Sequence, residues 1–325
     1  MKRRQFIQYS ALGASASLGS ISLAQSYPKG AVTVILPLQA GSASDVAVRH
    51  MSERLAQKFG VGFAVENIAA AAGVVGLDKV AKAKADGQTV AALNNSIMTI
   101  LPHLQPQNVK VDTRNDFVPI TGIANIPTFI TVPANSPVKS IKDLLTRARS
   151  ESGNMTYSSG GVGSPQHLAT ELLMSMTQIK LTHVPYRGAT QAALAVAANE
   201  VQVMSMALPL AQPFLPNNKI RFLAYSGLER HPQFRDVPTV NEQGIKGYEY
   251  SSWVGFFMHK DTPADIVSIL RKESEAIVGL RDFHSQLIRS GLDPWPQSAA
   301  QLGKIVQDDY AKWQRVIKDA KIQAT

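Results

Sequence analysis

The fold class is indicated most clearly by "VTVILPLQAGSASDVAVRHMSERL", Val32 to Leu55. It opens with an apolar run, which is typical of a strand buried on both faces of a parallel sheet. A loop with Gly41 and Ser42 follows, and Val48, Met51 and Leu55 then recur at the spacing of one helix face. The stretch therefore predicts a strand, a glycine-and-serine loop and a helix, the repeating unit of α/β proteins.

The same design returns in "YSSGGVGSPQHLATELL", Tyr157 to Leu173. The pattern around the first junction is β-α-β-α-β, and a second α/β unit runs from about Thr128 to Tyr250. We expect two α/β lobes, with residues 25–127 and 251–325 forming a discontinuous first domain and residues 128–250 the second. The chain would cross twice between them, which permits hinge closure over a ligand.

The first 24 residues, "MKRRQFIQYSALGASASLGSISLA", have a basic start, an apolar middle and small residues before Ala24. This is the pattern of a cleavable export signal, with cleavage expected near Ala24. The pair Arg3-Arg4 fits a twin-arginine signal or an ordinary Sec signal, and both remain open. We expect a periplasmic protein. The lack of cysteine is compatible with that compartment, and no later apolar run is long enough to cross a membrane.

The distribution of charge and the spacing of the histidines argue against several classes of function. The formal net charge is +9, but the basic residues are scattered, so we expect no nucleic-acid partner. The surplus indicates a mild attraction for anions or simply a solvated surface. The histidines lack metal-ligand spacing, and "GGVG" lacks the rest of a dinucleotide fingerprint, so we expect no metal and no cofactor.

The two junctions share one chemistry. The first turn of a helix has free backbone N–H groups and partial positive charge, and glycines let that backbone approach a ligand. The carboxyl ends of parallel strands face the crevice of such folds, so the junctions would face each other there. We expect a clamp for a small carboxylate, although glycine at each junction alone could serve only turn geometry.

Many segments together resemble one family, the extracytoplasmic receptors of tripartite tricarboxylate transporters, often called Bug receptors. The resemblance spans nearly the whole mature chain and rests on "PLQAGSASDVAVR", "VENIAAAAGVVGLDKVAKAKADGQTV", "DFVPI", "YSSGGVGSPQHLA", "HVPYRG", "DVPTVNEQG" and "SSWVGFF". It implies a two-lobe periplasmic binding protein of type II-like fold, without catalysis. Such a receptor, expected as a monomer, would deliver a small organic carboxylate to membrane permease subunits.

The resemblance also implies a set of ligand contacts, carried over by position. The first lobe would contribute Leu38, Gln39, Ala40, Gly41, Ser42 and Asp45, and the loop after its third strand Asn95 and Ser96. The second lobe would contribute Ser159, Gly161, Gly163, Ser164, His167, Tyr186 and Gly188.

Several of these residues also have ordinary structural interpretations. Asp45 is favourable near any helix start, His167 could cap or pack, and Trp253 and Phe256 fit a core as well as a cleft. Where the family has an aspartate that often faces a ligand amine or water, this chain has Gln202, which makes an amino-acid ligand less favoured.

Two other functions remain open at this point. One is an exported serine hydrolase that uses Ser164 or Ser159, although the G-x-S-x-G pattern is absent. The other is a receptor of the same fold that hands its ligand to a signalling partner.

Overall fold

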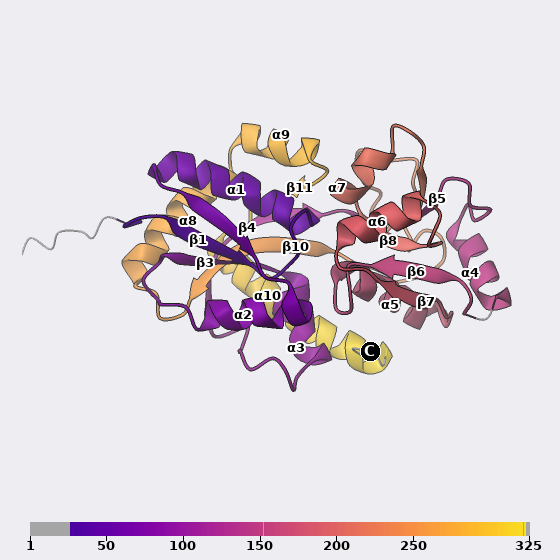
Figure 1. Cartoon of the computed structure of the whole chain (residues 1–325), viewed down its shortest axis with the longest axis horizontal. Helices are drawn as coiled ribbons and strands as arrows, with labels where there is room; N and C mark the ends of the chain where they lie inside the picture. The colour runs from indigo at the N-terminus through magenta and orange to yellow at the C-terminus, as the bar shows by residue number, and fades with distance from the viewer. Residues whose placement is uncertain (1–26, 152, 321, 323–325) are drawn as a thin grey trace, which may run out of the picture.

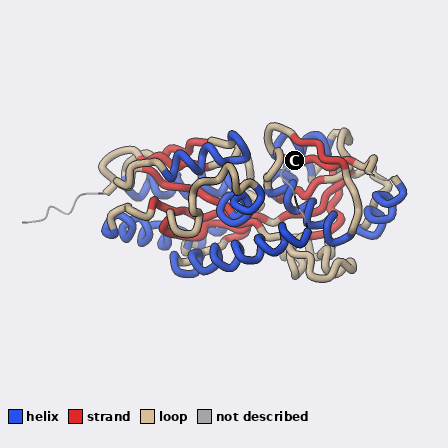
Figure 2. Tube along the Cα trace, turned by 90° about the horizontal axis from the view of Figure 1, so that it is seen from below, coloured by secondary structure: helices blue, strands red, loops and turns tan. Residues whose placement is uncertain are grey.

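The computed structural model describes residues 27–151, 153–320 and 322, so the predicted export signal lies outside the described residues. The chain folds into two α/β lobes lying side by side along the long axis (Figure 1), which confirms the predicted fold class. In each lobe the helices lie on the outside of the strands (Figure 2). None of the described helices is long and apolar enough to span a membrane.

The first lobe is built on a six-stranded sheet in the order β11-β4-β10-β3-β1-β2. Strand β1 pairs parallel with β2 and β3, whereas β10 pairs antiparallel with β3 and β4. The first part of the chain supplies β1 (Val32–Leu36), α1 (Ala43–Phe59), β2 (Phe63–Asn67), η1 (Ala70–Gly73), α2 (Val74–Ala81), β3 (Thr89–Asn94), η2 (Ser96–Ile100), α3 (Leu101–Leu104) and β4 (Phe117–Ile126). The last part supplies β10 (Ser252–His259), α8 (Ala264–Val278), α9 (Arg281–Arg289), β11 (Asp293–Pro294) and α10 (Ala299–Ala320).

The second lobe contains a three-stranded sheet, β8-β5-β9, and a parallel pair, β6-β7. Backbone hydrogen bonds from Ser158 to Val203 and from Val203 to Thr156 join β6 to the start of β8, so the two sheets are nearly continuous. Its elements are β5 (Thr128–Pro133), α4 (Ile141–Ser150), β6 (Thr156–Ser159), α5 (Pro165–Thr177), β7 (Thr182–Pro185), α6 (Ala189–Ala197), β8 (Met204–Ala207), α7 (Leu208–Ala211), η3 (Gln212–Phe214) and β9 (Ile220–Tyr225).

The sequence of the first junction explains its local structure. Four of the five β1 residues are buried, as a central strand requires. Ser42 caps α1, with its side chain accepting a hydrogen bond from the Asp45 N–H, and Gly60 ends the helix in the left-handed conformation. The second junction repeats the device, because the Ser164 side chain caps α5 by accepting from the His167 N–H.

Helix α10 reaches both lobes. Leu302 and Val306 pack in a core cluster of the first lobe, whereas Trp313 and Ile317 pack in the core of the second. The Trp313 ring lies 5.9 Å from that of Tyr250, centroid to centroid. We therefore propose the predicted domain boundaries with one addition, namely that the end of α10 covers the second domain rather than the first.

Candidate ligand-binding site

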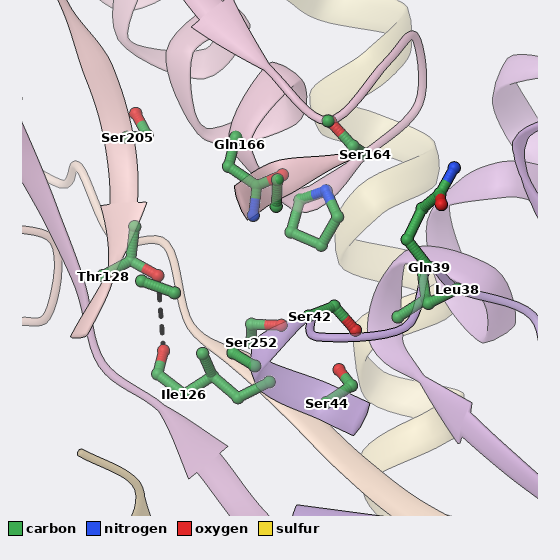
Figure 3. A pocket seen from close by; sticks show the side chains of 15 residues that line it. Leu38, Gln39, Ser42, Ser44, Ile126, Thr128, Ser164, Gln166, Ser205 and Ser252 are labelled. Atoms are coloured by element: carbon green, nitrogen blue, oxygen red, sulfur yellow. Dashed lines mark hydrogen bonds between the residues drawn. The ribbon is translucent and has the colours of Figure 1, made fainter. Parts of the chain in front are cut away.

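The two junctions meet at one cavity between the lobes, which we name the hinge compartment because Ile126, Thr128 and Ser252 line it (Figure 3). Its volume is about 40 Å³. None of its lining residues in the described chain is charged. They are Leu38, Gln39, Ser42, Ala43, Ser44, Ile126, Thr128, Gly160, Ser164, Pro165, Gln166, Ala189, Ser205, Ala207 and Ser252.

A neighbouring cavity of about 340 Å³, the loop compartment, shares four lining residues with the first. Its walls also include Pro37, Ala69, Ala71, Ala72, Ser96, Gln105, Gly161, Val162, Gly163, Tyr186 and Arg187. Arg187 is the one charged residue among those described at this compartment, so both compartments together favour a neutral or anionic guest.

The α1 end of the hinge compartment offers main-chain donors. The Asp45 N–H bonds the Ser42 hydroxyl and the Val46 N–H bonds the Ser42 carbonyl. The N–H groups of Ala43 and Ser44 come before the first intrahelical bond, so they are the free donors that a helix N-terminus presents to an anion.

Asp45 stabilises this loop through hydrogen bonds on the side away from the cavity. Its Oδ2 accepts from the Gly41 N–H at 2.9 Å and from Arg49 Nε at 2.9 Å, while its Oδ1 accepts from Asn67 Nδ2 at 2.9 Å. Asn67 also donates to the Leu38 carbonyl. The carboxylate is 3% exposed and lines neither compartment, so the structure gives it a positioning role in place of the predicted ligand contact.

His167 holds the second junction in the same manner. Its Nδ1 accepts from the Gly163 N–H at 3.2 Å, and its ring stacks on His183 at 4.6 Å between centroids. Burial, with a smaller contribution from His183, lowers the pKa of His167 to about 4, so the imidazole is neutral near pH 7. The side chain faces Gly163 from the protein interior and lines neither compartment.

Two further predicted contacts are also turned into the protein. Ser159 is fully buried, with its hydroxyl 2.6 Å from His183 Nε2. Asn95, expected in a loop, lies at the start of a helical turn, and its amide bonds the Ser251 carbonyl and the Ser252 hydroxyl. The geometry supports direct ligand contact by neither residue.

The geometry bears on the hydrolase hypothesis as well. The Ser164 hydroxyl accepts a main-chain N–H, and the nearest histidine in sequence, His167, has its Nδ1 occupied by Gly163. In the Ser159–His183 pair the serine is buried and the histidine is half-buried, and neither lines either cavity. No serine that faces the cavity has a histidine base among its described hydrogen bonds, which disfavours nucleophilic catalysis.

The predicted set is therefore divided. Those that line a compartment are Leu38, Gln39, Ser42, Ser96, Gly161, Gly163, Ser164 and Tyr186. Those that line neither are Ala40, Gly41, Asp45, Asn95, Ser159, His167 and Gly188. Gly41 and Gly188 nevertheless lie at the cleft: the Gly41 carbonyl accepts from Thr190 Oγ1 of the other lobe at 3.3 Å, and Gly188 faces the Gln39 side chain.

Sequence reasoning missed the polar residues on the hinge side, which are Thr128, Gln166, Ser205 and Ser252. A signal existed for Ser205, because it interrupts the otherwise apolar run "VMSMAL". Sequence reasoning also misplaced Gln202, whose side chain bonds the Thr156 backbone at 2.8 Å and lines neither compartment. Its identity therefore carries no information on a ligand amine. Trp253 and Phe256 are buried in the core.

Two lobes and a cavity between opposed helix N-termini are typical of solute-binding proteins of the periplasmic type, which hold a small molecule between their lobes. Residues 47–322 match the tripartite tricarboxylate transporter family receptors. The chain belongs to this family of receptors, as the sequence resemblance predicted.

Known relatives agree over nearly the whole length. A protein of Pseudomonas sp. (strain P51), described as the UPF0065 protein in the tcbD-tcbE intergenic region, is 30% identical over 99% of this chain and 96% of its own. The structure of R. palustris Rpa4515 with adipate has a TM-score of 0.87 and 30% identity, covering 92% of this chain and 99% of that one. MatC from Rhodopseudomonas palustris with bound malate has a TM-score of 0.84 and 25% identity, covering 90% and 100%.

Proposed function

We propose that this receptor captures a small organic carboxylate between its lobes and delivers it to the membrane permease subunits of a tripartite tricarboxylate-type transporter. The observation that carries the proposal is the convergence of the α1 and α5 N-termini on one cavity whose described lining residues are uncharged. Backbone N–H groups and helix dipoles favour an anion there without a formal positive charge. The relatives with adipate and malate support the same ligand class.

The ligand class is testable by thermal shift on protein freed of co-purified ligand. A ligand that binds only the folded state at about 100 times its Kd stabilises it by about 2.7 kcal/mol, which raises Tm by several degrees. Carboxylates of three to eight carbons should do this, and their neutral amides should not. Equal shifts by the amides, or no shift by any acid, would contradict the proposal.

The donors of α1 can be tested by substitution. Ala43 is the first residue of α1, a position where proline suits the helix and removes one N–H. Ala43→Pro should weaken binding of a carboxylate roughly tenfold, the loss of one hydrogen bond to a charged group. Ala264→Pro, at the first position of α8 in the first lobe, is the matched control and should bind normally. Unchanged affinity in Ala43→Pro would place the carboxylate elsewhere.

We further propose export to the periplasm with cleavage near Ala24, and a monomeric receptor. Mass spectrometry of the mature protein and its elution volume test both. A mature chain that retains residues 1–24 would contradict the export proposal.

A further inference from the structure

We infer that the hinge compartment binds a 2-hydroxy-carboxylate. The α1 end holds the carboxylate, and Gln166, Ser205 and Thr128 accept a hydrogen bond from the ligand hydroxyl. This inference rests on the proposed function and refines its ligand class. It follows from the directions in which the lining hydroxyls donate, which the surrounding hydrogen bonds determine.

The proton of Ser205 is already used. Thr170 Oγ1 lies 2.9 Å from the Gln166 carbonyl and 2.9 Å from Ser205 Oγ. A carbonyl can only accept, so Thr170 donates its single proton to the main-chain carbonyl of Gln166 in that hydrogen bond. With that bond in place, Ser205 is the donor to Thr170. Ser205 Oγ therefore meets the cavity as an acceptor.

Two more hydroxyls are arranged in the same way. Thr128 Oγ1 donates to the Ile126 carbonyl. Asn95 Nδ2 donates to the Ser251 carbonyl, which leaves Asn95 Oδ1 to accept from Ser252 Oγ. The hydroxyls of Thr128 and Ser252 thus donate to acceptors inside the protein and present lone pairs to the cavity.

Gln166 adds an unpaired group to this side. The residue is 7% exposed, and its Oε1 is buried without a hydrogen-bond partner in the described part of the chain. A buried acceptor left unpaired is costly, so a donor from the ligand would relieve it. Pro165 precedes it at the first position of α5 and lacks an N–H, which leaves α5 a weaker anion site than α1.

The opposite side of the compartment donates. The hydroxyls of Ser42 and Ser164 accept main-chain N–H groups, so their own protons remain available to a ligand. Figure 3 shows Thr128 and Ser205 at one side of the cavity and Ser42 and Ser164 at the other, with Gln166 between them. A ligand suited to this arrangement carries an acceptor anion at one end and a donor next to it.

The size of the hinge compartment and its lack of charge determine which donor group of a ligand it can accommodate. A compartment of about 40 Å³ has room for the centres of on the order of three water molecules, which suits a carboxylate with one neighbouring polar group. An ammonium group would also donate, but the described lining offers it no carboxylate partner. A hydroxyl donates without that cost. The remainder of a longer ligand extends into the loop compartment.

Matched acids test the inference by isothermal titration calorimetry. The sets are propionate, lactate and alanine; succinate, malate and aspartate; and adipate, 2-hydroxyadipate and 2-aminoadipate. In at least one set the 2-hydroxy acid should bind roughly tenfold more tightly than its parent, the typical effect of one hydrogen bond. The 2-amino acid should bind more weakly than the hydroxy acid.

Two variants assign the preference to residues. Gln166→Met and Ser205→Ala should lower affinity for the hydroxy acid more than affinity for the parent acid, so that the preference for the hydroxy acid shrinks. Ser150→Ala, on α4 and with its hydroxyl on the Arg147 carbonyl, should keep the wild-type preference. A reduced affinity for both acids to the same degree would indicate general damage and overturn the assignment.

The outcomes separate this inference from the proposed function. Equal binding of parent and hydroxy acid in the wild type overturns the inference and leaves the carboxylate receptor intact. Tightest binding by the amino acid also overturns it, because the acceptors would then serve an ammonium group. Failure of every acid to bind overturns the proposed function and the inference together.

Discussion

Gly163→Val probes the point where the second junction meets the first lobe. Gly163 has φ of +76°, and a Cβ built on it would lie 3.4 Å from the Ala72 Cβ across the cleft. Valine would place two more methyl groups near the first lobe. We expect the lobes of this variant to close less completely, and its ligand affinity to fall.

The magnitude has two parts with different causes. A side chain in the left-handed region costs about 1–2 kcal/mol with the lobes open or closed, so it lowers the free energy of unfolding and leaves affinity unchanged. Overpacking against Ala72 costs about 1–3 kcal/mol, and only when the lobes close. Since closure accompanies binding, Kd should rise roughly 5- to 150-fold.

Urea unfolding and calorimetry with a bound carboxylate separate the two parts. Gly60→Val is the control, because Gly60 has φ of +70° at the end of α1 and an added Cβ meets nothing within 4 Å. Both variants should lose similar unfolding free energy, and Gly163→Val alone should lose affinity. Wild-type affinity in Gly163→Val, or an equal loss of affinity in Gly60→Val, would show that contact with Ala72 does not limit closure.

Two further predictions concern the residues that hold the junctions from behind. Asp45→Ala should lower the free energy of unfolding by about 2 kcal/mol, because the Gly41 N–H and the Asn67 amide lose a charged acceptor. Asp143→Ala, at the equivalent but exposed position of α4, should cost under about 1 kcal/mol; equal losses in urea would contradict this. Burial in the folded state lowers the pKa of His167 from 6.5 to about 4, so the free energy of unfolding should fall by about 3 kcal/mol from pH 6.5 to pH 4. In His167→Gln, unfolding measured at each pH should show a smaller fall over this range.

Much of the fold was predictable because its signals are local. The apolar run of β1, the cap at Ser42 and the glycine at position 60 each act within a few residues, and the structure has a strand, a helix start and a helix end there. The second junction was predictable for the same reason. The packing of α10 against both lobes was not predictable, because it depends on contacts such as that of Trp313 with Tyr250, which lie more than sixty positions apart.

The site was predicted less completely, for a physical reason. A carboxylate near a helix start can either contact a ligand or support a loop, and so can a histidine one turn into a helix. The sequence pattern is the same for both roles, and only the hydrogen-bond partners in the structure distinguish them. Asp45 bonds Gly41, and His167 bonds Gly163, so both support loops. The acceptor hydroxyls Ser205 and Thr128 come from two strands far apart in sequence, and the directions of their protons depend on neighbours that no local pattern reveals.

The groups that the inference assigns to the carboxylate and to the hydroxyl come from different lobes, although the donor hydroxyl of Ser164 belongs to the second lobe and the acceptor hydroxyl of Ser252 to the first. The donors Ala43 and Ser44 belong to the first lobe, whereas the acceptors Gln166 and Ser205 belong to the second. A 2-hydroxy acid would therefore bind one lobe with each of its groups, and its full affinity would require closure. A parent acid lacking the hydroxyl would use mainly the first lobe. Gly163→Val, which hinders closure, should for this reason weaken the hydroxy acid more than its parent. An undiminished preference for the hydroxy acid in that variant would show that one lobe alone recognises both groups.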